Sequence, residues 1–232
     1  MRCHSVVLIA WVLVAANVAR AGVTGPTLYV GTGFSVAGEQ DTKIHDSTQP
    51  VPPPANPALG GPDFDFKYQD AALAEIGLGY RVMSHLRVEA NVNYRAHTLQ
   101  DVHYRGGSGD VHMIAGMGNV YADYPLGGRG ETGAIPILIP YVGAGVGVLW
   151  TKPRAEVRFP DRKIRGESSE FAWNVMLGTE IPITRFVALN FGYRYLESMD
   201  ARWLVKNGAS GVGDVDSAYR THEGRFGLRI GY

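Results

Sequence analysis

The side chains with the clearest capacity for chemistry are arginines and carboxylates that recur at every second position of several segments. The longest run is 86–97, LRVEANVNYRAH, where Arg87, Glu89 and Arg95 alternate with apolar or small residues. Successive side chains of a strand point to opposite faces, so these charges would share one face. A buried charge without a partner is strongly destabilising. The pattern therefore predicts a face on which arginines and carboxylates form ion pairs.

The same alternation assigns charged residues of other segments to this face. The predicted interior charge network comprises Glu75, Arg87, Glu89, Arg95, Asp123, Glu180, Arg194, Arg225 and Arg229. Glu170 and Glu223 fall on the same face. The simplest role is a polar core in which the charges satisfy one another. The alternative is a gated pore, in which a change of ion-pair partners opens a path for ions.

Catalytic and metal-binding patterns are weak in this sequence. His45, Asp46 and Ser47 are adjacent in a proline-rich stretch, which is not the geometry of a catalytic triad, and His97 stands near the end of its segment. The seven histidines show no metal-ligand spacing. We therefore expect no enzyme activity, no cofactor and no metal.

A glycine-rich segment, PYVGAGVGVLW at 140–150, allows three interpretations. A transmembrane helix is disfavoured by Pro136, Pro140 and glycines at every second position. A nucleotide-binding loop is disfavoured because no helix pattern follows the glycines. We interpret the segment as a strand whose glycines make room inside a narrow barrel.

Eight segments alternate in this way and must position the charges. They are 27–37, 68–80, 86–97, 111–124, 140–150, 170–181, 186–197 and 219–232. At ~3.3 Å per residue and a tilt near ~40°, ten to eleven residues rise roughly 25 to 28 Å, which suits the apolar band of an outer-membrane barrel. Because backbone groups in lipid must all be paired, the strands have to close. The predicted fold is all-β, a closed antiparallel eight-stranded transmembrane β-barrel.

The connections alternate between long and short. Four long outer loops are expected near 38–67, 98–110, 151–168 and 198–218, and three short periplasmic turns near 81–85, 125–139 and 182–185. A soluble, lipocalin-like barrel would have the same alternation with the two faces exchanged. Arginines and acids that share a face with glycines favour the membrane arrangement, because the other face collects nearly all the aromatic residues.

The amino terminus has the pattern of a secretory signal. Arg2, an apolar run from Val6 to Ala16 and a small-x-small site ending at Ala21 predict a signal peptide at 1–21, followed by a barrel at 22–232. Cleavage would remove Cys3, the one cysteine, and leave 20 basic against 22 acidic residues. This balance gives no indication of nucleic-acid binding.

Several motifs resemble the eight-stranded outer-membrane barrel family that includes outer-membrane protein A-like, opacity-type and surface-antigen proteins of Gram-negative bacteria. The matching stretches are GNVYADYPL at 118–126, PYVGAGVGVLW at 140–150, FGYRYL at 191–196 and the terminal RFGLRIGY. The resemblance implies a place in the bacterial outer membrane, in contact with its lipid. It also implies that Phe226, Leu228, Ile230 and Tyr232 form the signal read by the barrel-assembly machinery.

The resemblance specifies the barrel better than the function. We expect a surface protein whose outer loops mediate adhesion or other contacts with a host or cell-surface ligand. A small gated porin-like channel is the alternative. A lipid A-modifying enzyme is a weaker one, since it needs a His with Ser and an acidic partner at the outer rim.

Overall fold

The computed structural model describes most of the chain as strand. The described residues are 24–37, 40–45, 63–68, 70–101, 108–127, 136–157, 162–165, 168–199, 201–207, 211–217 and 219–231. They form one antiparallel sheet of thirteen strands. In these ranges no helix has the length and apolar character to cross a membrane. The expected signal peptide at 1–21 and Tyr232 lie outside the described residues.

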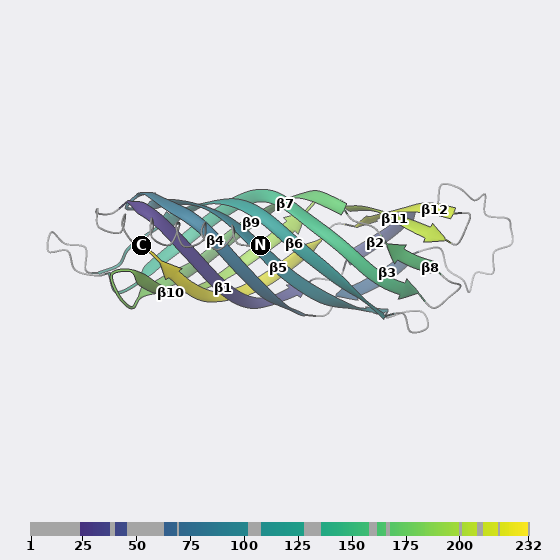
Figure 1. Ribbon diagram of the computed structural model, residues 1–232, viewed down its shortest axis with the longest axis horizontal. Helices are drawn as coiled ribbons and strands as arrows, with labels where there is room; N and C mark the ends of the chain where they lie inside the picture. Colours follow the sequence, from purple (N-terminus) through teal and green to yellow (C-terminus); the bar gives the residue numbers. More distant parts are fainter. Residues whose placement is uncertain are drawn as a thin grey trace, which may run out of the picture.

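Eight of these strands close into a barrel (Figure 1). They are β1 (Gly25–Ala37), β4 (Ala71–Met83), β5 (Leu86–Asp101), β6 (Ser108–Asp123), β7 (Ile139–Val157), β9 (Ser168–Pro182), β10 (Val187–Ser198) and β13 (Arg220–Ile230). Each pairs with its sequence neighbour in the barrel, and β1 pairs with β13 to complete the ring. The predicted closed, antiparallel, eight-stranded barrel is therefore confirmed.

The stagger of the strands sets the width of the barrel. A path that starts at Arg229 and steps across each strand pair passes through Tyr29, Gly77, Asn91, Met117, Gly147, Ala172 and Ser198. It returns to β13 at Tyr219, ten residues before its start, through the hydrogen bond from Ser198 N to Tyr219 O. Eight strands with a stagger of this size tilt by about 40° and enclose an interior that side chains can fill.

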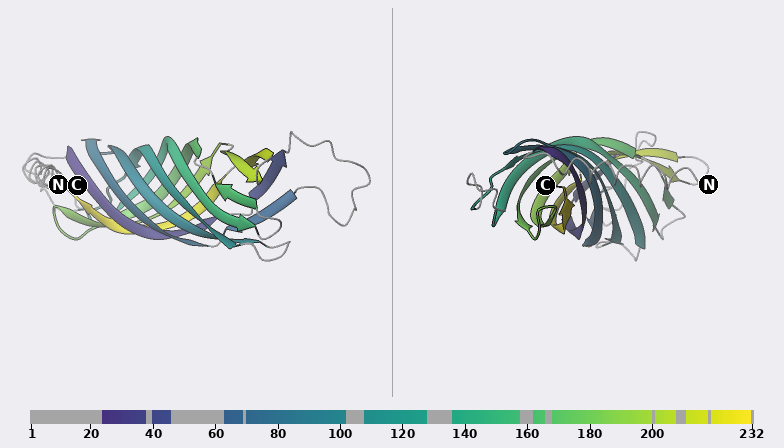
Figure 2. Two further views of the ribbon diagram at one scale, coloured as in Figure 1. Left: turned by 45° about the vertical axis from the view of Figure 1, so that its right-hand side comes forward. Right: turned by 60° about the vertical axis from the view of Figure 1, so that its left-hand side comes forward.

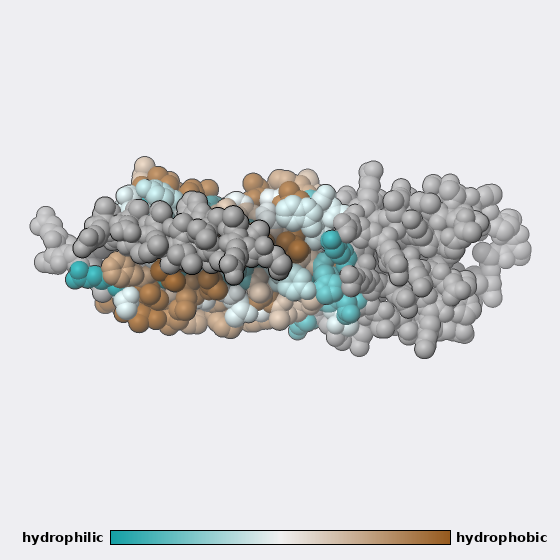
Figure 3. All heavy atoms as spheres, viewed as in Figure 1, coloured by the Kyte–Doolittle hydropathy of each residue, from teal (hydrophilic) through white to brown (hydrophobic). Residues whose placement is uncertain are grey.

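The two faces of the wall have opposite character, as predicted for a membrane barrel. Apolar side chains such as Ile76, Val92 and Leu228 are exposed on the outside, and arginines and carboxylates are buried inside. Figure 3 shows apolar residues over much of the visible barrel surface. The inverted, soluble arrangement is therefore wrong for this chain.

Much of the sequence expected to form long loops is strand, which corrects the predicted loop bounds. Five short strands lie there: β2 (Gln40–His45), β3 (Asp63–Tyr68), β8 (Arg162–Arg165), β11 (Ala201–Asn207) and β12 (Gly211–Ser217). The strands β5, β6 and β7 also run several residues beyond their predicted ends. The extended parts of these long strands present backbone N–H and C=O groups. Neighbouring segments pair with these groups and so continue the sheet.

These segments form a second ring, which we call the collar: β2, β3, β8, β11 and β12 with the far ends of β5, β6 and β7. The ring closes because β3 pairs with β5, β2 with both β3 and β12, β11 with both β12 and β8, and β8 with β7. Figures 1 and 2 show it beyond one end of the barrel. We call that end the loop end and the opposite one the turn end.

The collar continues the barrel with little change of register. Ser35 lies opposite Ala71 in the barrel, and five residues further on Gln40 lies opposite Phe66 in the collar. Where β7 passes from β9 to β8, the pairing is likewise unshifted. The loop end is therefore an extension of the barrel wall.

The turn end has short connections. Ser84 and His85 join β4 to β5, and the turn between β9 and β10 is held by Thr184 Oγ1, which accepts hydrogen bonds from the backbone of Phe186 and Val187. The expected turn at 81–85 was three residues too long, because β4 continues to Met83 and Arg81 still points inward. A register shift follows it, between Arg81 and Met83.

An arginine at Val92 should cost about 2 to 4 kcal/mol of unfolding free energy in a lipid bilayer, because this position is exposed on the outer wall between Ile76 and Gly116. Thr98→Arg is the matched control: it lies exposed on the same face of β5, nearer the loop end, where the cost should be at most ~1 kcal/mol. Urea unfolding in vesicles measures both. Equal costs would contradict this placement of the membrane.

Candidate functional site

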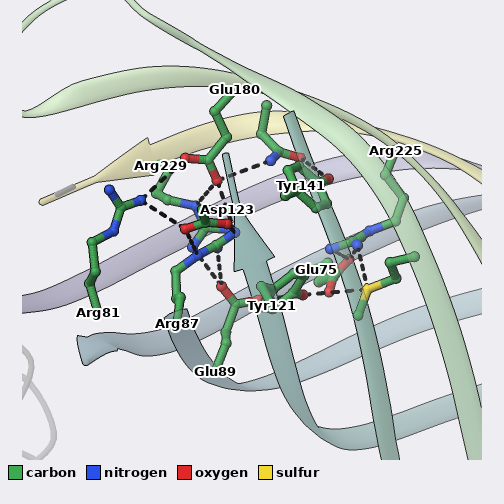
Figure 4. A network of polar contacts seen from close by, with 12 residues as sticks. Glu75, Arg81, Arg87, Glu89, Tyr121, Asp123, Tyr141, Glu180, Arg225 and Arg229 are labelled. Carbon is green, nitrogen blue, oxygen red and sulfur yellow. Dashed lines mark hydrogen bonds and ion pairs between the residues drawn. The ribbon is translucent and has the colours of Figure 1, made fainter. Parts of the chain in front are cut away.

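The interior of the barrel holds two groups of ion pairs. The first includes Arg81 and Arg87, which flank the turn at 84–85, and so lies toward the turn end; Figure 4 shows it with part of the second group. This turn-side cluster consists of Arg81, Arg87, Glu89, Asp123, Glu180 and Arg229. Arg229 joins two of its carboxylates: its Nη1 lies 2.6 Å from Glu89 Oε2 and its Nε 2.6 Å from Glu180 Oε1. Such short contacts between charged groups are the strong class of hydrogen bonds.

The other two arginines of this cluster connect all three carboxylates. Arg87 lies 3.1 Å from Asp123, 3.3 Å from Glu89 and 3.3 Å from Glu180. Arg81 Nη2 lies 3.1 Å from Asp123 and 3.9 Å from Glu180. Three arginines thus face three carboxylates, and each carboxylate contacts at least two arginines. Formal charge is balanced within the cluster.

The second group, the loop-side cluster, consists of Glu75, Arg95, Arg194, Glu223 and Arg225. Arg225 lies 2.8 Å from Glu75, and Arg194 lies 3.3 Å from the same carboxylate. Arg95 and Arg194 both form ion pairs with Glu223. Three arginines share two carboxylates here.

Uncharged side chains connect the two clusters. The Tyr121 hydroxyl lies within donor distance of two acceptors, 3.3 Å from Glu89 Oε1 and 3.4 Å from the Met176 sulfur, which share its one proton. Arg225 Nη1 donates to the same sulfur over 3.2 Å. The guanidinium of Arg87 lies 4.2 Å from the centre of the Tyr121 ring, within the range of cation–π attraction. The interior is therefore one continuous polar network.

Glycines opposite the tyrosines make this packing possible. A Cβ at Gly143 would lie 2.6 Å from Tyr121 Cδ1, and a Cβ at Gly178 would lie 2.6 Å from Tyr141 Cζ. Gly143, Gly145 and Gly147 all lie within β7. They make room in a narrow barrel, as predicted, and belong to no nucleotide-binding loop.

All nine residues of the predicted charge network lie in these two clusters, and none of them is more than 5% exposed. The structure adds Arg81, which the alternation Glu75, Gly77, Gly79 along β4 could have identified, because Arg81 continues it by one step. Glu223, placed on this face by the sequence, completes the loop-side cluster. Glu170 is buried and accepts a hydrogen bond from Ser168 over 2.6 Å.

The weaker catalytic candidates do not come together in the described part of the chain. His45 ends β2, whereas Asp46 and Ser47 lie outside the described residues. His97 is buried inside the barrel, with its Nε2 2.9 Å from the Tyr219 hydroxyl. No group of three or more His, Cys, Asp or Glu side chains among the described residues could hold a metal ion.

The residues expected to signal assembly lie on the outer face of β13. Phe226, Leu228 and Ile230 are exposed there and pair with β1 on one side and β10 on the other. Tyr232 is outside the described residues.

Replacing Glu180 by Gln should lower the unfolding free energy by about 3 to 5 kcal/mol, because the buried arginines around it would lose a shared charge. The matched control is Glu197→Gln on the outer wall. Glu197 pairs at 3.0 Å with Arg220, whose side chain is 63% exposed, so its loss should cost at most ~1 kcal/mol. Urea titration of the refolded barrel compares the two, and similar losses would refute a tightly coupled interior.

The chain matches a known protein family and several relatives. Residues 6–228 match the model of the outer membrane protein beta-barrel domain. An uncharacterized protein of Brucella abortus is 26% identical over 207 residues, covering 71% of this chain and 70% of the relative. Equivalent uncharacterized proteins of Brucella suis and Brucella melitensis match to the same extent.

Two solved structures have the same fold at low sequence identity. The outer membrane protein OprG from Pseudomonas aeruginosa is 13% identical with a TM-score of 0.56, covering 88% of this chain and 95% of that one. The outer membrane protein AlkL is 17% identical with a TM-score of 0.57, covering 90% and 92%. Together with the polar interior and apolar outer wall, the family match shows that this chain belongs to the outer membrane protein beta-barrel domain family and resides in the bacterial outer membrane.

Proposed function

We propose that this protein is a non-conducting, non-enzymatic scaffold that carries the collar beyond the outer membrane for contacts at the cell surface. The observation that carries the proposal is the filled interior: eleven charged side chains in two clusters, each in an ion pair and each nearly or completely buried. A side chain that lines an open, water-filled pore would be exposed to solvent.

The collar supports the second half of the proposal. Its strands prolong the barrel wall and form a closed ring, so it has no free sheet edge in the paired region. A closed ring of paired strands that prolongs the wall suits contacts with a host molecule or a neighbouring cell. The proposed orientation puts the loop end outside the cell and the turn end in the periplasm.

A gated channel is the second candidate, and one observation favours it. Each turn-side carboxylate already contacts two or more arginines. An exchange of partners could therefore occur without leaving any charge unpaired. Against it, the clusters fill the same cross-sections as Tyr121 and Tyr141, whose rings meet edge to face at 5.6 Å.

Assembly is part of the proposal. The outward row Phe226, Leu228 and Ile230 would present the closing strand to the barrel-assembly machinery, with Tyr232 as its last member. The same row meets lipid once the barrel is complete.

Orientation can be tested with single cysteines, because Cys3 is the one natural cysteine and lies in the expected signal peptide. Asp110→Cys, exposed near the loop end, should react with a membrane-impermeant maleimide on intact cells. Arg185→Cys, exposed in the turn between β9 and β10, should react only after the outer membrane is broken. The reverse pattern would overturn the proposed orientation.

Conductance separates the scaffold from the channel. The purified barrel in a planar bilayer should show no discrete current steps, because the ion pairs close the interior. Removing a central arginine in Arg229→Ala should introduce steps or reduce stability, since Glu89 and Glu180 both lose a partner. Regular opening and closing of the unmodified barrel would favour the gated channel instead.

A further inference from the structure

Four asparagines form a separate group inside the barrel, between the turn-side and loop-side clusters. Asn91 and Asn93 lie on β5, Asn119 on β6 and Asn174 on β9. All four are at least 97% buried and lie on the inward face of the wall. We call this group the asparagine cluster.

Their positions in the sheet bring the amides together around one glycine. Asn119 lies opposite Gly145 of β7, and Gly145 lies opposite Asn174. The Asn174 amide donates to Asn119 Oδ1 over 3.0 Å, across the glycine between them. A Cβ at position 145 would lie 2.0 Å from that oxygen, so a larger residue there would block the contact.

Asn91 and Asn93 extend the cluster along β5. They are successive inward residues, separated by about 7 Å along the strand. Asn91 faces Met117, so Asn119 is its diagonal neighbour on β6, about 7 to 8 Å away. No direct hydrogen bond joins Asn91 to either neighbour, and water molecules can bridge neighbouring amides at this spacing.

Several buried amide atoms of the cluster have no hydrogen-bond partner among the described residues. They are Asn91 Nδ2, Asn91 Oδ1, Asn93 Nδ2, Asn119 Nδ2 and Asn174 Oδ1. Leaving a buried polar group unsatisfied is destabilising, and nearly all such groups in folded proteins are satisfied. Five such atoms in one small region indicate a shared ligand.

The chemistry of these atoms identifies the class of ligand. Three are amide nitrogens that donate, and two are amide oxygens that accept. An anion could use only the donors and a cation only the acceptors. Water both donates and accepts, and buried water typically makes about three hydrogen bonds to such groups. We therefore propose that the asparagine cluster binds ordered water molecules, which complete the hydrogen bonding of the interior between the two ion-pair clusters.

Asn190 is a natural control for the asparagine cluster, because it is a buried asparagine with hydrogen-bond partners in the protein. It is also buried on the inward face, but its Oδ1 accepts from the Tyr141 hydroxyl over 3.2 Å and its Nδ2 donates to Glu180 over 3.4 Å. Its hydrogen bonds are supplied by protein groups, so it should have no need of bound water.

Nuclear magnetic resonance of the unmodified, ¹⁵N-labelled barrel tests the site directly. Magnetisation transfer from water should reach the side-chain amide protons of Asn91 and Asn119 and leave those of Asn190 without a cross-peak. Water cross-peaks absent from both Asn91 and Asn119 would overturn the proposal. Because this measurement uses the natural sequence, it does not depend on whether any variant folds.

An apolar substitution gives a second test, in which the direction of the shift in the urea midpoint distinguishes a hydrated site from a dry one. In a hydrated site, Asn91→Leu displaces water that also serves Asn93 and Asn119, so the urea midpoint should fall. In a dry site, the same substitution removes two unsatisfied atoms, and the midpoint should rise. Asn190→Leu should lower the midpoint in either case. A rise for Asn91→Leu beside a fall for Asn190→Leu would contradict bound water.

Discussion

The structure depends on one constraint: a polar group that is removed from water must form a hydrogen bond or an ion pair with another polar group. In the wall, the backbone meets this condition by closing the sheet, because an open edge in lipid would leave amides and carbonyls unpaired. In the interior, the arginines and carboxylates meet it by sharing partners in the two clusters. Gly143 of β7 and Gly178 of β9 serve the same condition, since they make room for Tyr121 and Tyr141, which fill space between the charges.

Alternation of residue types was sufficient to predict the barrel and its charged interior. It works for strands such as β5 because lipid and lumen impose opposite polarity on successive residues. The faces could be assigned only because arginines and glycines coincide on one of them. Arg81 was missed because it stands next to a turn, although its parity matches Glu75.

The collar could not be predicted in this way. Segments such as Gly211–Ser217 and Arg162–Arg165 are short and carry little apolar alternation, and Pro153 lies within β7. Their strand conformation comes from pairing with neighbours that extend past the membrane, which is a tertiary effect. The hydrogen bonds of the asparagine cluster likewise depend on which residues lie across Gly145, and that follows from the stagger of the whole barrel.

The ring is closed by its first and last strands: Leu28 of β1 pairs with Ile230 of β13, and Val30 with Leu228. Every other junction in the barrel joins strands that are much nearer to each other in the sequence. The final seam must bring together segments about two hundred residues apart, a contact of very high sequence separation. Closing the wall therefore requires both the first and the last barrel strand, and a sheet that lacks either one has two open edges whose backbone groups must be shielded from lipid.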